Sequence, residues 1–168
     1  MILKSLSKNF YINSLIVFLV YGLDRISKLY IIYLDKNNLN SDIFTSTYLN
    51  ITLIWNRGIA FGFFSFDRNT FYNVLSAVIA FVIFILLMMA IKNSGLKRYS
   101  LLIIIGGALG NLHDRLFFSA VPDFIDFHIG DFHWFIFNVS DIFITVGVIS
   151  MILLEIVGNN KNNVNKKI

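Results

Sequence analysis

The chain has 168 residues, of which 57% are hydrophobic and 14% are charged, and its mean hydropathy is +0.71. Soluble domains usually carry about 25% charged residues, so an ordinary water-soluble fold is excluded and a single membrane-embedded domain over residues 1–168 is favoured. The absence of cysteine excludes disulfides, thiolate metal sites and cysteine nucleophiles. A net charge of +4 can indicate nucleic acid. In so apolar a chain, however, the positions of the basic residues matter more than their sum, and no nucleic-acid partner is expected.

The first apolar run, residues 10–23, follows Lys4 and Lys8. This order is also that of a secretory signal peptide, but no small-residue cleavage site follows and apolar residues resume at 29–34. About 20 helical residues cross the hydrocarbon core of a bilayer, so a first membrane helix over residues 10–34 is the better interpretation.

Three charged residues, Asp24, Arg25 and Lys28, lie in the second half of this helix. Asp24 and Lys28 are four residues apart, so they share one helical face. One interpretation ends the helix near Leu23 and leaves an ordinary solvated pair. The other buries the pair at the outer end of the helix, where charges at membrane depth usually mark function.

The longest polar stretch, residues 35–69, follows the first span. Residues 47–55 mix β-branched and aromatic side chains with partial alternation, which predicts short strands. The segment NRGIAFGFFSF at 56–66 has two glycines for tight backbone geometry and aromatics suited to a lipid-headgroup interface.

Three further membrane spans are predicted at residues 71–91, 99–118 and 135–157. Gly106 and Gly110 in the third have the small-xxx-small spacing that lets another helix approach closely. The sequence Ile129-Gly130-Asp131, before the fourth span, is typical of a hairpin turn.

The basic residues predict the orientation of the four spans. With an inside N-terminus, the inside segments carry Lys4, Lys8, Lys92, Lys97, Arg98, Lys161, Lys166 and Lys167. The outside loops carry Lys36, Arg57 and Arg68, together with most of the acids. Basic residues favour the cytoplasmic side, so both termini are predicted to be cytoplasmic.

Under this topology the polar side chains of the spans all fall at the outer ends of their helices. They are Asp24 and Lys28 in the first span, Asn111, Asp114 and Arg115 in the third, and Asn138 and Asp141 in the fourth. Within each helix these residues share a face, because three or four residues bring a side chain round to the same side. Chance scatter would not put them on one level of the bilayer, so a functional site is predicted there.

Two acids, Asp123 and Asp141, stand where two helix ends could bring them together. Two carboxylates about 3 Å apart cannot both ionise, so they share a proton. One can then take a proton from water while the other donates to a carbonyl oxygen, which is the logic of aspartic proteases. Acids at helix ends are also common as N-terminal caps, so spacing alone leaves both interpretations open.

Other chemistries have less support. His113, His128 and His133 show no HExxH or other metal spacing, so interfacial or structural roles are favoured. Ser27 and Lys28 point about 100° apart on a helix, which disfavours a Ser–Lys dyad. A transporter would need polar residues through the inner half of the bilayer, where the spans are almost wholly apolar. A purely structural membrane subunit leaves the convergent polar residues unexplained.

Five sequence blocks resemble, in order, those of lipoprotein signal peptidase (signal peptidase II), the bacterial aspartic endopeptidase of the inner membrane. They are DRISK at Asp24–Lys28, NRGIAFG at Asn56–Gly62, GGALGNLHDR at Gly106–Arg115, VPDF at Val121–Phe124 and FNVSD at Phe137–Asp141. The resemblance implies that Asp123 and Asp141 are the catalytic pair. It also implies supporting or substrate-binding roles for Asp24, Lys28, Asn56, Gly58, Asn111, Asp114, Arg115 and Asn138.

The resemblance further implies an all-α membrane fold: four transmembrane helices with a small extracytoplasmic β-cradle, from 35–69, and a flap-like loop, from 119–134. The family cleaves prolipoproteins before a diacylglyceryl-modified Cys at the outer face of the membrane, works among membrane lipids, is inhibited by globomycin, and uses no metal or cofactor. A monomer is expected. Two residues depart from the family pattern: Ser140 replaces the usual Ala and is expected to add a hydrogen bond, and Pro122 is expected to stiffen the flap.

Overall fold

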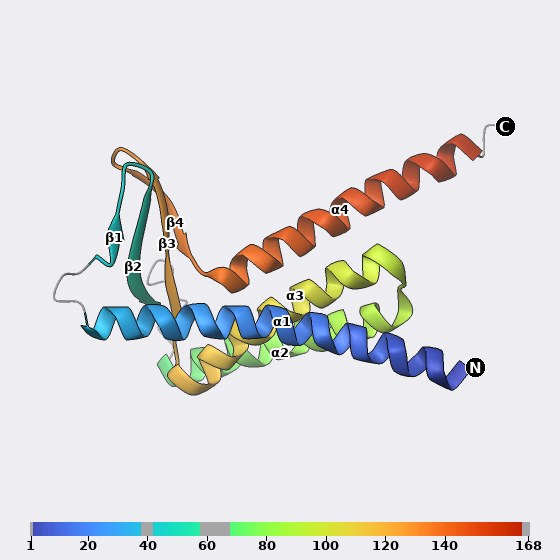
Figure 1. Ribbon diagram of the computed structural model, residues 1–168, viewed down its shortest axis with the longest axis horizontal. Coiled ribbons are helices and arrows are strands. Elements are labelled where there is room, and N and C mark those ends of the chain that lie inside the picture. Colours follow the sequence, from blue (N-terminus) through green and yellow to red (C-terminus); the bar gives the residue numbers. More distant parts are fainter. Residues whose placement is uncertain (1, 38–41, 58–67, 166–168) are drawn as a thin grey trace.

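The computed structural model describes residues 2–37, 42–57 and 68–165, and Figure 1 shows long helices with a small sheet at one end. The elements are α1 (Ile2–Asn37), β1 (Phe44–Thr45), β2 (Leu49–Asn56), α2 (Arg68–Lys92), α3 (Gly95–Phe118), β3 (Val121–Ile129), β4 (Phe132–Phe137) and α4 (Val139–Asn165). The predicted combination of a mainly helical chain and a small sheet is confirmed.

Within the described residues, three helices are long and apolar enough to cross a membrane: Tyr72–Lys92, Gly95–Phe118 and Val139–Gly158. Large apolar side chains point outward from them, which is expected for surfaces that contact lipid rather than water. α1 is also long and exposes apolar side chains, but Asp24, Arg25 and Lys28 interrupt its apolar run.

α3 packs against each of the other three helices. The apolar core lies mainly where α3 meets α2, with Leu101, Leu102 and Ile105 of α3 buried against Ile83 and Ala90 of α2. The remaining faces of α3 are therefore available to α1 and α4, and these faces carry its polar residues.

Glycines let α3 approach its neighbours closely, as their spacing predicted. A Cβ atom on Gly106 would lie 2.7 Å from Cβ of Val20 in α1. A Cβ atom on Gly110 would collide with the Asp24 carboxylate and the Ser140 hydroxyl. Side chains at these two positions would therefore push α1 and the start of α4 away from α3.

The sheet is antiparallel with strand order β1-β2-β3-β4, so it combines two connections that are far apart in the sequence. β2 pairs with β3 in a register that sets Ile54 opposite Asp123. β3 pairs with β4 through the predicted hairpin turn, where Gly130 has φ 57°. Glycine adopts this left-handed conformation without the steric cost that a Cβ brings.

Residues 119–134 do not form the loop that was predicted for the flap-like cover, although the hairpin turn predicted within them is present. Most of this segment forms β3 and the start of β4, and β3 is hydrogen-bonded between β2 and β4. Pro122 therefore lies in a strand. Pairing with β4 begins only at Ile125, so the missing N–H of Pro122 falls where one side of β3 is open.

The predicted start of the fourth span at residue 135 is also wrong. Residues up to Phe137 belong to β4, and α4 begins at Val139. Hydrophobicity alone does not show whether a short apolar run forms a strand or the start of a helix. In this chain, Asn138 caps α4 and fixes where the helix starts.

We expect Gly106→Ala to lower the free energy of unfolding by about 1–3 kcal/mol, because the added methyl overpacks the contact with Val20. Gly22→Ala is the matched control, since a Cβ there meets nothing within 4 Å. Thermal unfolding in detergent measures both. Adding Val20→Ala should recover part of the loss, and equal effects at Gly22 and Gly106 would contradict the packing argument.

Candidate active site

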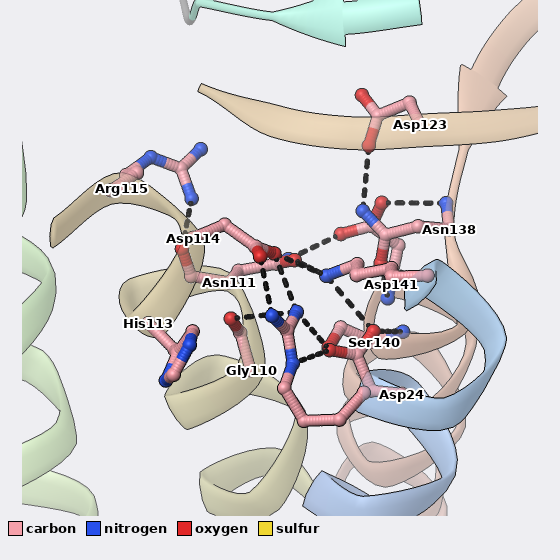
Figure 2. Close-up of polar contacts among 12 residues, drawn as sticks. Asp24, Gly110, Asn111, His113, Asp114, Arg115, Asp123, Asn138, Ser140 and Asp141 are labelled. Carbon is pink, nitrogen blue, oxygen red and sulfur yellow. Dashed lines mark hydrogen bonds and ion pairs between the residues drawn. The ribbon is translucent and has the colours of Figure 1, made fainter. Parts of the chain in front are cut away.

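Polar side chains from α1, α3, β3 and the start of α4 meet at the end of the helices next to the sheet (Figure 2). The labelled members include Asp24, Asn111, Asp114, Asp123, Asn138, Ser140 and Asp141. Asp24, Asp114, Asn138 and Ser140 have no exposed surface. With the exception of Arg115, the polar residues singled out at the ends of the predicted spans therefore form one largely buried network with Asp123 of β3.

Asn138 caps α4 and holds Asp141 in the same contacts. The Asp141 backbone N–H donates to Asn138 Oδ1 at 3.2 Å, and the Asn138 backbone N–H donates to Asp141 Oδ2 at 3.1 Å. This reciprocal pattern is a capping box, with Asp141 at the third position of the helix. The carboxylate also lies at the positive end of the helix dipole, which stabilises its charge.

The Asp123 carboxylate accepts hydrogen bonds at both oxygens. Asn138 Nδ2 donates to Oδ1 at 2.6 Å, and Asn56 Nδ2 of β2 donates to Oδ2 at 2.8 Å. Asp123 is only 4% exposed, and this burial raises the pKa of its carboxyl above the ordinary value. The two amide hydrogen bonds and the charge of Lys28 lower this pKa, and the charge of Asp141 raises it.

Asn111 connects Asp141 to a buried lysine. Asn111 Nδ2 donates to Asp141 Oδ1 at 2.8 Å, and Lys28 Nζ donates to Asn111 Oδ1 at 2.8 Å. Because an ammonium can only donate, the amide oxygen of Asn111 must face Lys28 and its NH2 group must face Asp141. Lys28 thereby fixes the orientation of the amide that contacts Asp141.

Four charged side chains form an ion cluster between α1 and α3: Asp24, Arg25, Lys28 and Asp114. Arg25 makes a bidentate contact with Asp114 at 2.6 and 2.7 Å and reaches Asp24 at 2.8 Å. Lys28 Nζ lies 2.9 Å from Asp24 and 2.7 Å from Asp114. Two cations and two anions balance, and the interpretation of Asp24 and Lys28 as a solvated pair is wrong.

Asp24 also fastens α4 to this cluster. The backbone N–H of Ser140 donates to Asp24 Oδ1 at 3.0 Å. The Ser140 hydroxyl is buried, and within the described part of the chain it has no hydrogen-bond partner, so the bond expected from replacing Ala is not observed. Ser27 turns its hydroxyl to the backbone oxygen of Asp24 at 2.8 Å.

Two candidate residues stand apart from the acid pair. Arg115 Nη1 donates to the Asn111 backbone oxygen at 3.2 Å, and Figure 2 shows its side chain apart from Asp123 and Asp141. Gly58 lies outside the described residues.

Sequence reasoning did not give Arg25 a role, although it makes most contacts in the ion cluster. Its place inside the DRISK block was the available signal.

A second polar group, not predicted from the sequence, lies on the sheet. Asp126, His128 and His133 offer ligand atoms that all lie within 4.8 Å of one another. His113 lies elsewhere, in α3, where its Nδ1 is 2.9 Å from the Tyr21 hydroxyl. The predicted hairpin could have revealed the group, because residues 128 and 133 flank the turn symmetrically.

The arrangement presents two carboxylates whose four oxygens each accept an N–H from an amide or the backbone. Each oxygen retains a lone pair for a water molecule or a shared proton. In the contacts described here, neutral groups rather than cations touch the two carboxylates. Such a pair has the components needed for general acid–base work.

The chain is similar to known proteins over most of its length. Residues 16–157 match the family model described as Signal peptidase (SPase) II. It is 49% identical to a lipoprotein signal peptidase of Pelagibacter ubique, covering 92% of this chain and 93% of the relative, and 47% identical to one of Anaplasma phagocytophilum, covering 86% and 92%. A bacterial membrane enzyme solved at 2.3 Å superposes with TM-score 0.68 and 31% identity, covering 89% of this chain and 90% of that one.

We expect Asp114→Asn to lower the free energy of unfolding by about 3–5 kcal/mol, because it leaves Arg25 and Lys28 buried with one anion between them. Glu155→Gln removes an acid from an exposed pair with Lys97 and should leave the free energy of unfolding nearly unchanged. Denaturation of both variants in the same detergent makes the comparison. Equal losses would show that the cluster is not a structural requirement.

Proposed function

The chain belongs to the signal peptidase (SPase) II family, and from this premise we propose that it is an aspartic endopeptidase of diacylglyceryl-modified prolipoproteins. It removes the signal peptide by cleavage before the lipid-modified Cys, with Asp123 and Asp141 as the catalytic pair. The observation that carries the proposal is that one residue, Asn138, contacts both carboxylates, so a single side chain and its backbone set their relative position.

In this mechanism the pair holds one proton and one attacking water. The ionised carboxylate takes a proton from the water as it attacks the scissile carbonyl, while the protonated acid donates to the carbonyl oxygen. A neutral diol forms and collapses, and the proton passes to the leaving amine. The raised pKa of Asp123 fits a pair that retains one proton.

The amide side chains serve as positioning groups in this mechanism. Asn56, Asn111 and Asn138 orient the carboxylates through neutral N–H donors. Because a protonated acid polarises the carbonyl, a separate oxyanion hole is not required. Gly58 and Arg115, by the resemblance of their blocks to the family motifs, are assigned to substrate contact.

We place the enzyme in the bacterial inner membrane with four spans, α1 included, both termini cytoplasmic and the acid pair at the outer face. α1 begins and α4 ends far from the sheet in Figure 1, which fits an even number of crossings. Exposed aromatics on the hairpin, such as Phe132 and Trp134, suit a headgroup interface. The acyl chains of the substrate then stay in lipid, and a monomer suffices.

Asp123→Asn and Asp141→Asn should each reduce cleavage of a diacylglyceryl-modified prolipoprotein at least about 10³-fold, because an amide can neither accept the water proton nor share one. Purified variants are compared by gel shift of the substrate. Asp131→Asn, an exposed change in the hairpin turn, is the matched control and should cut at the wild-type rate. A thermal transition near that of the wild type shows that each variant is folded.

Wild-type cleavage rates in both folded variants would make the two aspartates structural and would remove the proposed mechanism. Failure of the wild type itself to cut the lipid-modified substrate would reject the proposed activity.

We expect Asn56→Ala to move the alkaline limb of the pH–rate profile to higher pH. The hydrogen bond from Asn56 lowers the pKa of Asp123, so its loss leaves that pKa further raised and the pair keeps its proton to higher pH. Asn50→Ala, on the same strand, is the control. A limb that stays in place or moves to lower pH would contradict the assigned role of Asn56.

A further inference from the structure

We infer that Asp126, His128 and His133 form a site for one divalent transition-metal ion, such as Zn²⁺, on the β3–β4 hairpin. Their ligand atoms lie within 4.8 Å of one another. His133 Nδ1 is 2.8 and 3.0 Å from the two Asp126 oxygens. Two ligands of a tetrahedral zinc ion stand roughly 3.3 Å apart, so small side-chain movements suffice to admit the ion.

Strand geometry brings the three side chains together. His128 and His133 are directly paired across β3 and β4, and their rings stack with centroids 5.0 Å apart. Asp126 precedes His128 by two residues, which places both side chains on the same face of β3. The glycine turn sets the pairing of His128 with His133, and the ladder shifts register between Asp126 and His128, with the extra residue on β4. All three ligands therefore come from paired strands rather than from a loop.

An unsatisfied nitrogen gives independent support. His128 Nδ1 is buried, and the part of the chain that the structure describes offers it no hydrogen-bond partner. Buried polar atoms are rarely left in this state, and a bound ion is one of the partners that satisfies them. Asp126 is also buried, at 5% exposure, whereas the His133 side chain is 52% exposed and leaves a path for the ion.

The ligand chemistry selects the class of metal. Two imidazole nitrogens with one carboxylate oxygen suit Zn²⁺, Ni²⁺ or Cu²⁺, while Mg²⁺ and Ca²⁺ prefer oxygen ligands alone. With no cysteine in the chain and His113 as the one remaining histidine, competing soft sites are few. Three protein ligands leave a position for water.

The site is separate from the acid pair. Asp123 and Asp126 are three residues apart in β3, so their side chains leave opposite faces of the strand. A metal ion there would fasten β4 to β3 rather than take part in hydrolysis. The inference is therefore independent of the proposed function, and its test reads binding instead of cleavage.

The test is titration calorimetry of Zn²⁺ into the purified full-length chain in a neutral detergent, with any histidine tag removed and Hepes as the buffer. We expect one Zn²⁺ per chain, a rise of the thermal midpoint on binding, and no competition from excess Mg²⁺. His133→Ala and Asp126→Asn should each weaken binding at least about tenfold, since even outer-shell changes at metal sites cost that much. His113→Gln is the matched histidine control and should bind as the wild type does.

Absence of binding at micromolar Zn²⁺ in the wild type would overturn the inference. Equal loss in the His113 variant, or unchanged affinity in both cluster variants, would overturn it as well. His133→Gln keeps the size of the half-exposed side chain, and circular dichroism of this variant shows whether a loss of binding reflects unfolding.

Discussion

The ion cluster between α1 and α3 is the constraint on which the rest of the structure depends. Removing charges from water costs several kcal/mol per ion, so Asp24, Arg25, Lys28 and Asp114 are tolerable in a buried position only together. Their geometry demands that the two helices lie side by side at one level, and Gly106 and Gly110 allow the required approach. Loss of any one member would leave an opposite charge buried without compensation.

Two contacts connect this cluster to the acid pair and help to position it. The Ser140 N–H bond to Asp24 places the first turn of α4, and Lys28 orients the amide of Asn111. Asn138 then uses the ordinary capping of a helix to hold Asp141, and its remaining NH2 group to hold Asp123. The helix cap that starts α4 therefore also positions both acids.

The sequence predicted the parts of this arrangement that follow from the helical period and from the free-energy cost of placing charges at membrane depth. Asp24 and Lys28 share a helical face at membrane depth, and such charges require partners, which made a buried site foreseeable. Arg25 points elsewhere by helical period, and only the tertiary structure shows that its long side chain turns back to Asp24 and Asp114.

The pattern of apolar and polar residues was less informative between α3 and α4. The apolar run ending at Phe137 suits a strand or a helix, and pairing with β3 decided the outcome. Asp126, His128 and His133 lie close together because of the way β3 pairs with β4. Their spacing in the sequence shows this only when the strands are paired about the predicted turn.

The cationic side chains and the amide side chains of the site contact different acids. A cation in contact with both acids would favour their ionised forms and would remove the proton that the proposed mechanism requires the pair to share. Here the cations contact Asp24 and Asp114, while the contacts described for Asp123 and Asp141 come from amides and the backbone. Asn111 lies between the two groups: it accepts a hydrogen bond from Lys28 and donates one to Asp141. Lys28 therefore orients the contact to Asp141 through Asn111. In the proposed mechanism, amide contacts of this kind position the two carboxylates and leave them able to exchange a proton, as general acid–base catalysis requires.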